Sequence, residues 1–377
     1  MFSFHHTTYI LFGTLCFPIL IMYLFQSRIV EKHSKTFRVF YKLFCKYFFP
    51  TMPYKVPKTD PFDYPLPPFP NTWYPICIQQ TIKSGSIYPF RIAGRDLVVY
   101  VDTQNDVHIQ SRYCPHMGVD LQYGTIQKDC IICPFHHHCI NPEKANTQIG
   151  EKNKQIYPCE VACGIIFVWI GPLTDNRPEY SIRQLFTEFY GNEQPSLCHS
   201  SFFERRVGGH LVDYAEHLLD ITHAPYTHGV ELEVVDNSLI LKPHSFMVQF
   251  AIKNTSFRPK FTYITPTFGF VDYGFTMKTF IMFVVEDVGQ IRMIQLPIVS
   301  GRFTDITGSI FAALYTHFDF TEEAAFFSTK CHLNRSLTKK ESSMLQFREW
   351  FTETYYTTDE RKRFREKQEF LKTITSW

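Results

Sequence analysis

Residues able to bind a redox metal occur first in the segment RYCPHMGVDL…CIICPFHHHC. Cys114 and His116 form one short motif, and Cys133 and His136 form a second, which begins after sixteen intervening residues. Two thiolates and two neutral imidazoles are the ligands of a mixed [2Fe–2S] cluster, in which the cysteines hold one iron and the histidines the other. The imidazoles raise the reduction potential above that of an all-thiolate cluster. The four residues therefore predict an electron-transfer centre.

Zinc is the competing occupant of this segment. Cys130 and Cys133 have the spacing of a zinc knuckle, and His136, His137, His138 and Cys139 offer further ligands. Zinc motifs rarely contain C-P-H-x-G and C-P-F-H together between two strand-forming runs. The iron–sulfur interpretation is therefore favoured, with a zinc site as the alternative.

A second set of metal-ligand residues follows in ERRVGGHLVDYAEHLLDITHAPYTHG. It contains Glu216-x3-Asp220-x2-His223-x4-His228, with polar residues at helical spacing. Two histidines and a carboxylate on one face of a ferrous ion, with the other positions open, are the ligand set of many O2-activating enzymes. His223 and His228 are the expected imidazole ligands. On a helix, Asp220 lies on the face of His223, where a carboxylate can hydrogen-bond a ligand imidazole and fix its orientation.

Length and composition are compatible with two such centres. A chain of 377 residues is long enough for two domains with separate cores, and its net charge of +2 gives no indication of a nucleic-acid partner. The odd number of cysteines, eleven, argues against a complete disulfide framework and favours a reducing compartment in which some cysteines bind metal. The 38 Phe and 21 Tyr favour contact with a membrane or a large apolar ligand, or a Phe-rich core.

The N-terminus contains a long apolar segment. From Thr7 to Gln26 there is no charged residue, and twenty residues are about what a helix needs to cross a bilayer. A cleavable signal peptide is the alternative, but neither a charged n-region nor a small-residue cleavage site is evident. Residues 28–58 contain eight Lys or Arg against one acid, so the positive-inside rule places the rest of the chain in the cytoplasm. We expect a single-pass protein of the endoplasmic reticulum membrane, anchored through residues 1–27.

Beyond the anchor, the chain divides into a linker and two domains, which together give an α+β fold class. Residues 28–71 are basic and Pro-rich and predict a stiff linker. Residues 72–175 contain the strand-type runs LVVYV, DVHIQ and GIIFVWI and predict an all-β domain. Residues 176–377 combine helical and strand signals and predict an α+β domain. The tail from Leu345 to Leu371 is expected to form a charged helix, mostly with a solvated face.

The two motifs in this order resemble those of the α subunits of Rieske oxygenases, over roughly residues 72–355. The sterol branch of that family, with the Neverland-type cholesterol 7-desaturases and bacterial ketosteroid hydroxylases, shares further features with this chain. These are the N-terminal anchor, the Pro-rich lead-in to NTWYP, the run GIIFVWIGP and the E-x3-D-x2-H-x4-H pattern. The resemblance implies a helix-grip-like catalytic domain with an antiparallel sheet, and a homotrimer.

The resemblance also implies the cofactors and the electron path. A Rieske [2Fe–2S] cluster receives electrons from NAD(P)H through a separate reductase or ferredoxin and passes them to a mononuclear Fe(II) that uses O2. Asp220 bridges the cluster of one subunit and the iron of its neighbour. A separate reductase is consistent with the absence of a G-x-G-x-x-G motif in a strand–turn–helix setting.

The third iron ligand implied by the resemblance is a carboxylate far downstream. In the family an aromatic residue follows this acid after four residues and a lysine after seven, and Glu323, Phe327 and Lys330 match that pattern. The usual ligand is aspartate, so glutamate is a departure, and Glu322 and Asp319 are the rival positions.

Other positions also distinguish this chain from the protein families that it resembles. His137-His138 stands where the family usually has Gly-Trp, and His217 stands where it has Asn. Respiratory Rieske proteins carry a disulfide-forming cysteine in each cluster loop, at the positions of Val119 and Phe135. The cluster therefore resembles the lower-potential type that serves oxygenases.

The function implied is oxidation of a sterol, with cholesterol 7-desaturation, which introduces a C7–C8 double bond, as the first choice. Hydroxylation of a sterol or another membrane-soluble lipid is the alternative within this class. Two other classes remain: a Rieske electron-transfer protein without oxygenase chemistry, and a zinc-stabilised membrane scaffold. Nothing in the sequence favours the substrates of choline- or chlorophyll-type Rieske oxygenases.

Overall fold

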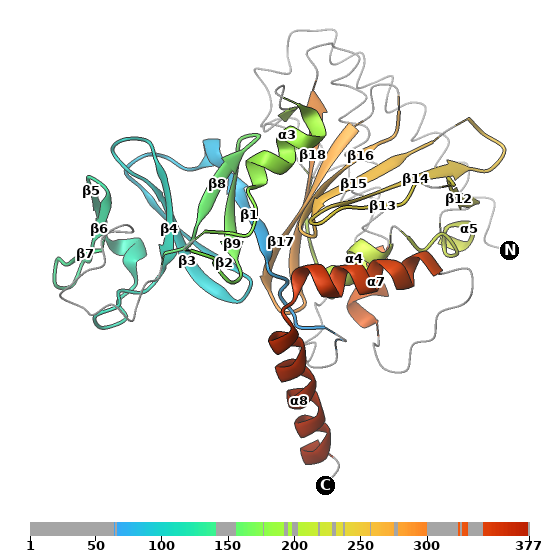
Figure 1. Ribbon diagram of the computed structural model, residues 1–377. Coiled ribbons are helices and arrows are strands. Elements are labelled where there is room, and N and C mark those ends of the chain that lie inside the picture. Colours follow the sequence, from blue (N-terminus) through green and yellow to red (C-terminus); the bar gives the residue numbers. More distant parts are fainter. Residues whose placement is uncertain are drawn as a thin grey trace, which may run out of the picture.

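The computed structural model shows two β-rich parts that share one hydrophobic core (Figure 1). It describes residues 64–140, 156–299, 323–330 and 342–375, apart from residues 65, 176, 192–194, 198–202, 218, 228–230, 237, 257, 275–277 and 325. The expected anchor, residues 1–27, lies outside this part of the chain. Among the described residues, no helix has the length and apolarity needed to span a bilayer.

The N-terminal part is all-β, as expected, and consists of three antiparallel sheets of three strands each. The orders are β1-β9-β8, β2-β3-β4 and β5-β6-β7. The runs LVVYV, DVHIQ and GIIFVWI lie at β3, β4 and β9. The strands are β1 Thr72–Ile78, β2 Ile87–Ile92, β3 Arg95–Val101, β4 Val107–Ser111, β5 Thr125–Gln127, β6 Cys130–Ile132, β7 Cys139–Ile140, β8 Cys159–Ala162 and β9 Ile165–Ile170, with the short helices η1 Gln79–Thr81 and η2 Leu121–Tyr123.

The C-terminal part is built on a nine-stranded antiparallel sheet in the order β10-β18-β17-β16-β15-β14-β12, with β11 paired to β18 and β13 to β14. The expected α+β fold with an antiparallel sheet is confirmed. Its strands are β10 Ser196–Leu197, β11 Phe203–Val207, β12 Leu232–Val234, β13 Ile240–Leu241, β14 Phe246–Ile252, β15 Lys260–Thr265, β16 Phe268–Asp272, β17 Lys278–Asp287 and β18 Gln290–Val299. Its helices are α3 Ile182–Tyr190, α4 Leu211–His217, α5 Ala224–Thr227, α7 Ser342–Tyr355 and α8 Thr358–Thr375.

The two parts meet where β1 lies beside β17 (Figure 1). Trp73 of β1 donates its indole N–H to the carbonyl of Tyr180 over 2.8 Å, and its own carbonyl accepts from the Thr267 hydroxyl over 2.6 Å. Every residue of β9, the neighbour of β1, is buried. A strand covered on both faces has a continuous apolar sequence, and this explains the run GIIFVWI.

The C-terminal tail forms two helices, α7 and α8, and not one, so the expectation of one helix was wrong. Thr357 lies between the two helices and begins the second with a capping box: the Glu360 N–H donates to the Thr357 hydroxyl at 3.2 Å, and the Thr357 N–H donates to the Glu360 carboxylate at 2.8 Å. α7 is also less solvated than expected, because Phe347 and Phe351 are fully buried.

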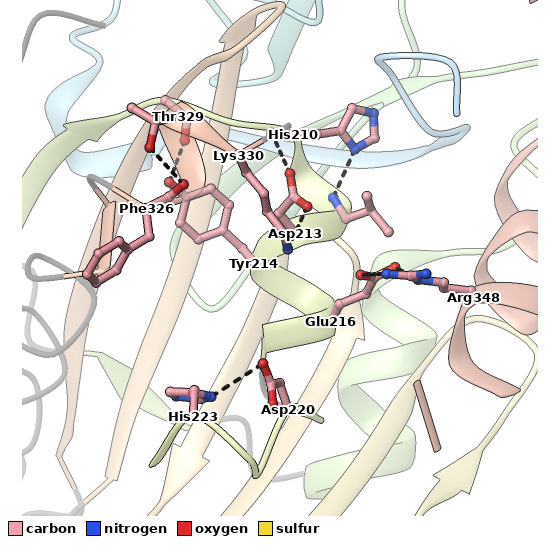
Figure 2. A network of polar contacts seen from close by, with 12 residues as sticks. His210, Asp213, Tyr214, Glu216, Asp220, His223, Phe326, Thr329, Lys330 and Arg348 are labelled. Atoms are coloured by element: carbon pink, nitrogen blue, oxygen red, sulfur yellow. Dashed lines mark hydrogen bonds and ion pairs between the residues drawn. The ribbon is translucent and has the colours of Figure 1, made fainter. Parts of the chain in front are cut away.

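An ion pair between a buried carboxylate and a partly exposed guanidinium joins α7 to α4. The guanidinium of Arg348 contacts both carboxylate oxygens of Glu216, at 2.5 and 2.8 Å (Figure 2). Glu216 is only 3% exposed, so this fork of donors replaces hydrogen bonds that its carboxylate has lost from water. The motif glutamate therefore has a structural role that the sequence did not indicate.

Replacing Arg348 by alanine leaves the Glu216 carboxylate buried without this partner. Breaking a buried pair in this way costs about 3 kcal/mol, and we expect the urea midpoint to fall by a corresponding amount. Lys253→Ala is the control, because it removes the exposed ion pair with Glu231, at 2.7 Å, where screening by water leaves little stabilisation. Equal midpoints for the two variants would contradict this role of Arg348.

Candidate metal centres

Two loops with the same hydrogen-bond pattern carry the first pair of motifs. In the loop 114–119, the Gly118 N–H donates to the Cys114 carbonyl and the Cys114 N–H donates to the Val119 carbonyl, both over 2.8 Å. The same two bonds recur in the loop 133–138, with lengths of 3.0 and 2.9 Å. The loops are thereby held as a matched pair.

The four predicted cluster ligands lie in these two loops, where the two cysteines are neighbours and the two histidines are neighbours. Cys114 and Cys133 are buried, whereas His116 and His136 are exposed and their Nδ1 atoms are 3.2 Å apart. Burial and the neighbouring Cys133 thiol raise the pKa of Cys114. Two adjacent thiolates therefore require a cation to stabilise them. Two inner sulfurs and two outer imidazoles fit a Rieske [2Fe–2S] cluster.

The backbone explains one of the departures from the family. Gly118 and His137 occupy corresponding places in the two loops, and both have positive φ, 71° and 57°. For a residue with a Cβ, this left-handed conformation costs about 1–2 kcal/mol. The left-handed conformation of the loop therefore explains why the family has glycine at the position of His137. In this chain a residue with a Cβ adopts the same conformation, at that cost in free energy.

The rival zinc ligands are arranged differently. Cys130 and Cys139 form a disulfide between β6 and β7, the strands that flank the second loop. A thiol in a disulfide cannot bind zinc as a thiolate. The disulfide also differs from the expectation of reduced cysteines, and it arises because the two residues lie near each other on adjacent antiparallel strands. His138 remains close, with its ring 5.0 Å from that of His116.

The second candidate centre combines α4, the turn that follows it and a segment about one hundred residues later. Nε2 of His217 lies 2.5 Å from Oε2 of Glu323, and Nε2 of His223 lies 3.3 Å from Oε1 of the same carboxylate. One donor atom from each of these residues lies within 4.8 Å of the others. Glu323 is only 2% exposed. The structure thus places a buried carboxylate between two imidazoles.

The electrostatics of this centre favour a cation. Burial disfavours the charged form of His223, but its contacts with Asp220 and Glu323 outweigh this effect and raise its pKa to about 9. The two carboxylates thus give the site an excess of negative charge. With imidazole and carboxylate donors, the site fits a divalent transition metal such as Fe(II).

Asp220 does not share a helix with His223, contrary to expectation. α4 ends at His217, and Asp220 lies in the turn before α5, where its Oδ1 accepts hydrogen bonds from the Thr222 N–H at 3.1 Å and hydroxyl at 2.7 Å. Its Oδ2 lies 3.7 Å from Nδ1 of His223 (Figure 2). Burial raises the pKa of Asp220, but the proximity of His223 and the hydrogen bonds from Thr222 outweigh it and hold the pKa below its usual range. The turn therefore achieves the proximity that a helix was expected to supply.

Three of the predicted positions cannot be compared with the structure. His228, the second expected imidazole ligand, lies outside the described residues, as do Glu322 and Asp319, the rivals of Glu323. Among the described residues, the structure brings together His223, Asp220 and Glu323, and it adds His217.

Glu323 is positioned by contacts that the sequence analysis did not assign. Lys330 Nζ lies 3.1 Å from Oδ1 of the buried Asp213 (Figure 2). The ring of Phe327 packs on Tyr214, with centroids 4.7 Å apart. The aromatic residue and the lysine of the downstream pattern therefore fasten their segment to α4. Asp213 is an acid within the otherwise largely apolar sequence LVDYAEH, and this unusual position is the signal that could have predicted a buried partner such as Lys330.

Comparison with known proteins agrees with this geometry. Residues 72–160 match the family described as the Rieske [2Fe-2S] domain. Cholesterol 7-desaturase nvd of Drosophila melanogaster is 37% identical over 113 residues, which cover 27% of this chain and 26% of the relative. An oxygenase component of 3-ketosteroid-9-alpha-monooxygenase from Rhodococcus rhodochrous is 21% identical over 348 residues, which cover 82% of this chain and 88% of the relative. The chain is thus similar to the Rieske [2Fe-2S] domain family over residues 72–160, and to a ketosteroid monooxygenase component over most of its length.

The fold of the chain also matches solved structures. The terminal oxygenase of carbazole 1,9a-dioxygenase from Nocardioides aromaticivorans IC177 superposes with a TM-score of 0.58 and 14% identity, over 78% of this chain and 96% of that one. At this identity, the likeness concerns the fold alone. The matches with the first curated relatives, including the Drosophila protein, span less than half of those proteins' length.

Single substitutions can separate the predicted cluster ligands from their neighbours. We expect His136→Ala to remove the reduced-state EPR signal and the acid-labile sulfide of the Rieske cluster, because one iron loses a ligand. His138→Ala is the matched control and should retain both, since His138 is outside the predicted ligand set. Loss of zinc instead of iron and sulfide in His136→Ala would support the zinc alternative.

Proposed function

We propose that this chain is a membrane-anchored Rieske oxygenase that acts on a sterol, and specifically a cholesterol 7-desaturase that forms the C7–C8 double bond. The observation that carries oxygenase chemistry is the convergence of His223 and Glu323 from distant parts of the chain. Burying a carboxylate is costly unless a partner compensates its charge. An electron-transfer protein without a second metal has no use for such a site.

In this proposal the residues divide into two sets. Cys114, His116, Cys133 and His136 are proposed to hold the cluster, which is supported by the burial of the two thiols and by the 3.2 Å between the Nδ1 atoms of the two histidines. The ligands of the second metal are proposed to be His223, His228 and Glu323. When bound there, Fe(II) would supply the activation of O2 and the oxidation of a C–H bond of the sterol.

Asp220 is proposed to orient His223 and to form the bridge to the cluster of a neighbouring subunit in a homotrimer. Its carboxylate faces Nδ1 of His223, opposite the ring nitrogen that faces Glu323. A carboxylate on the outer nitrogen of a ligand imidazole fixes the tautomer and the ring orientation. This support does not depend on the identity of the substrate.

Desaturation removes two hydrogens from C7 and C8 of the sterol. One O2 accepts them together with two further electrons and two protons, and two waters result. The electrons are proposed to come from NAD(P)H through a separate reductase or ferredoxin. The sterol assignment is supported by the local similarity to cholesterol 7-desaturases and by the aromatic composition.

Hydroxylation of a sterol is the second candidate. The observation in its favour is the similarity to the ketosteroid monooxygenase component, which extends over most of both chains. Both reactions use the same donors and differ in whether an oxygen atom is retained in the product.

The substrate proposal can be tested in cells that lack 7-dehydrosterols. We expect the full chain, supplied with cholesterol, to produce a conjugated 5,7-diene, identified by its ultraviolet absorbance and mass. His223→Ala should abolish the diene while the cluster spectrum remains, because this substitution affects only the second centre. A hydroxylated sterol in place of the diene would favour the second candidate. Absence of both products beside an intact cluster would contradict a sterol oxygenase.

The anchor can be tested by fractionation. We expect the full chain to stay in the membrane pellet after alkaline carbonate extraction, and a chain lacking residues 1–27 to appear in the supernatant. A single apolar helix supplies enough buried surface to resist this extraction, whereas a basic segment held by charge does not. Release of the full chain would contradict the anchor.

A further inference from the structure

The two oxygens of the Glu323 carboxylate face two different imidazoles. Oε2 faces Nε2 of His217, and Oε1 faces Nε2 of His223. His217 is the last residue of α4, and His223 immediately precedes α5. The carboxylate therefore has two chemically distinct sides.

The distances from the two Glu323 oxygens to His217 and to His223 differ in whether they are compatible with two ligands of one metal ion. Donor atoms about 2.1 Å from a shared metal and at right angles to each other lie about 3 Å apart. The 3.3 Å between His223 and Oε1 suits two ligands of one ion. The 2.5 Å between His217 and Oε2 is too short for that arrangement and is the distance of a direct ion-pair contact between the imidazole and the carboxylate.

The ring of His217 is held in place independently of any metal. It packs edge-on against Phe327, with centroids 5.0 Å apart, and lies 4.2 Å from the ring of His223. Phe327 is one helical turn beyond Glu323. The segment that carries the carboxylate thus also supports the ring that contacts it.

We propose that His217 is a positioning residue that holds Oε2 of Glu323 and leaves Oε1 to bind the metal as a single-oxygen ligand. A carboxylate fixed in this way occupies one coordination position, which leaves more positions open for O2. The inference rests on the proposed function in taking Glu323 as a ligand of the mononuclear iron. His217 and Glu323, the two departures from the family near this centre, therefore act as a pair.

The test measures mononuclear iron and does not require turnover. The wild type, His217→Asn, Glu323→Asp and the double variant are reconstituted with Fe(II) and dialysed against a graded chelator. Iron in excess of the cluster is obtained from the ratio of iron to acid-labile sulfide. We expect His217→Asn to lower iron affinity about 10-fold or more, as loss of a residue that orients a ligand does.

Coupling between the two residues is the specific expectation. Because Glu323→Asp shortens the side chain and withdraws it from His217, the double variant should bind iron no more weakly than Glu323→Asp alone. His244→Asn is the matched control: this half-buried histidine stacks on Tyr180 at 3.9 Å and has no role in the site. It should bind iron like the wild type, and an unchanged cluster spectrum shows that each variant is folded.

Three results would overturn the inference. The first is wild-type iron affinity in His217→Asn, and the second is full additivity of the two losses. The third is one fewer imidazole nitrogen in pulsed EPR of the nitric oxide adduct of His217→Asn, since His217 is then a ligand itself. If the wild type itself binds no iron beyond that of the cluster, the proposed function fails as well. If the wild type binds this iron and one of the three results is found, only the inference about His217 fails.

Discussion

The cost of placing the Glu323 carboxylate in the protein interior constrains the whole second half of this structure. An ionised carboxylate loses its hydration there, and only hydrogen bonds or opposite charge can compensate for the loss. Two imidazoles face this carboxylate, and the segment behind it is fastened to α4 through Lys330 and Phe327. α4 is fastened in turn to α7 through Glu216 and Arg348. The site and the helical layer are therefore stabilised by the same set of buried charges.

The first centre follows a different physical rule. Its sulfurs lie inside a small apolar core formed with Val98, Tyr100, Leu121 and Ile131, whereas its imidazoles point outward. In a cluster held by these residues, the buried thiols would shield the iron that they bind from water, and the exposed imidazoles would place the other iron near the surface, within reach of an electron-transfer partner. The second loop also contains a left-handed His137 and is bracketed by the Cys130–Cys139 disulfide. The strands on either side of the loop hold that strained position in place.

The interface between the N-terminal and C-terminal parts fixes their relative orientation. β1 belongs to the first part but its residue Trp73 is bonded to Tyr180 and Thr267, on the far side of the interface. An ion pair between Arg91 and Asp287, at 2.8 Å, joins the edges of the same two parts. A shared core of this kind resists domain rotation, so the orientation of the cluster does not depend on a flexible linker.

The sequence by itself determined the ligand types and the local strands. Cys114, His116, Cys133 and His136 are recognisable because each pair is only a few residues apart, and short loops bring such pairs together whatever surrounds them. The runs at β3, β4 and β9 are recognisable for a similar reason, since strand periodicity is local. Tertiary structure decided the rest. That His217 meets Glu323 and that Arg348 pairs with Glu216 depend on segments that only folding brings together. The contact between Asp220 and His223 is local, and there the structure decided only that a turn, and not a helix, forms it. Contacts over a hundred residues leave no periodic signal in the chain, because they are selected by the packing of the core and not by spacing.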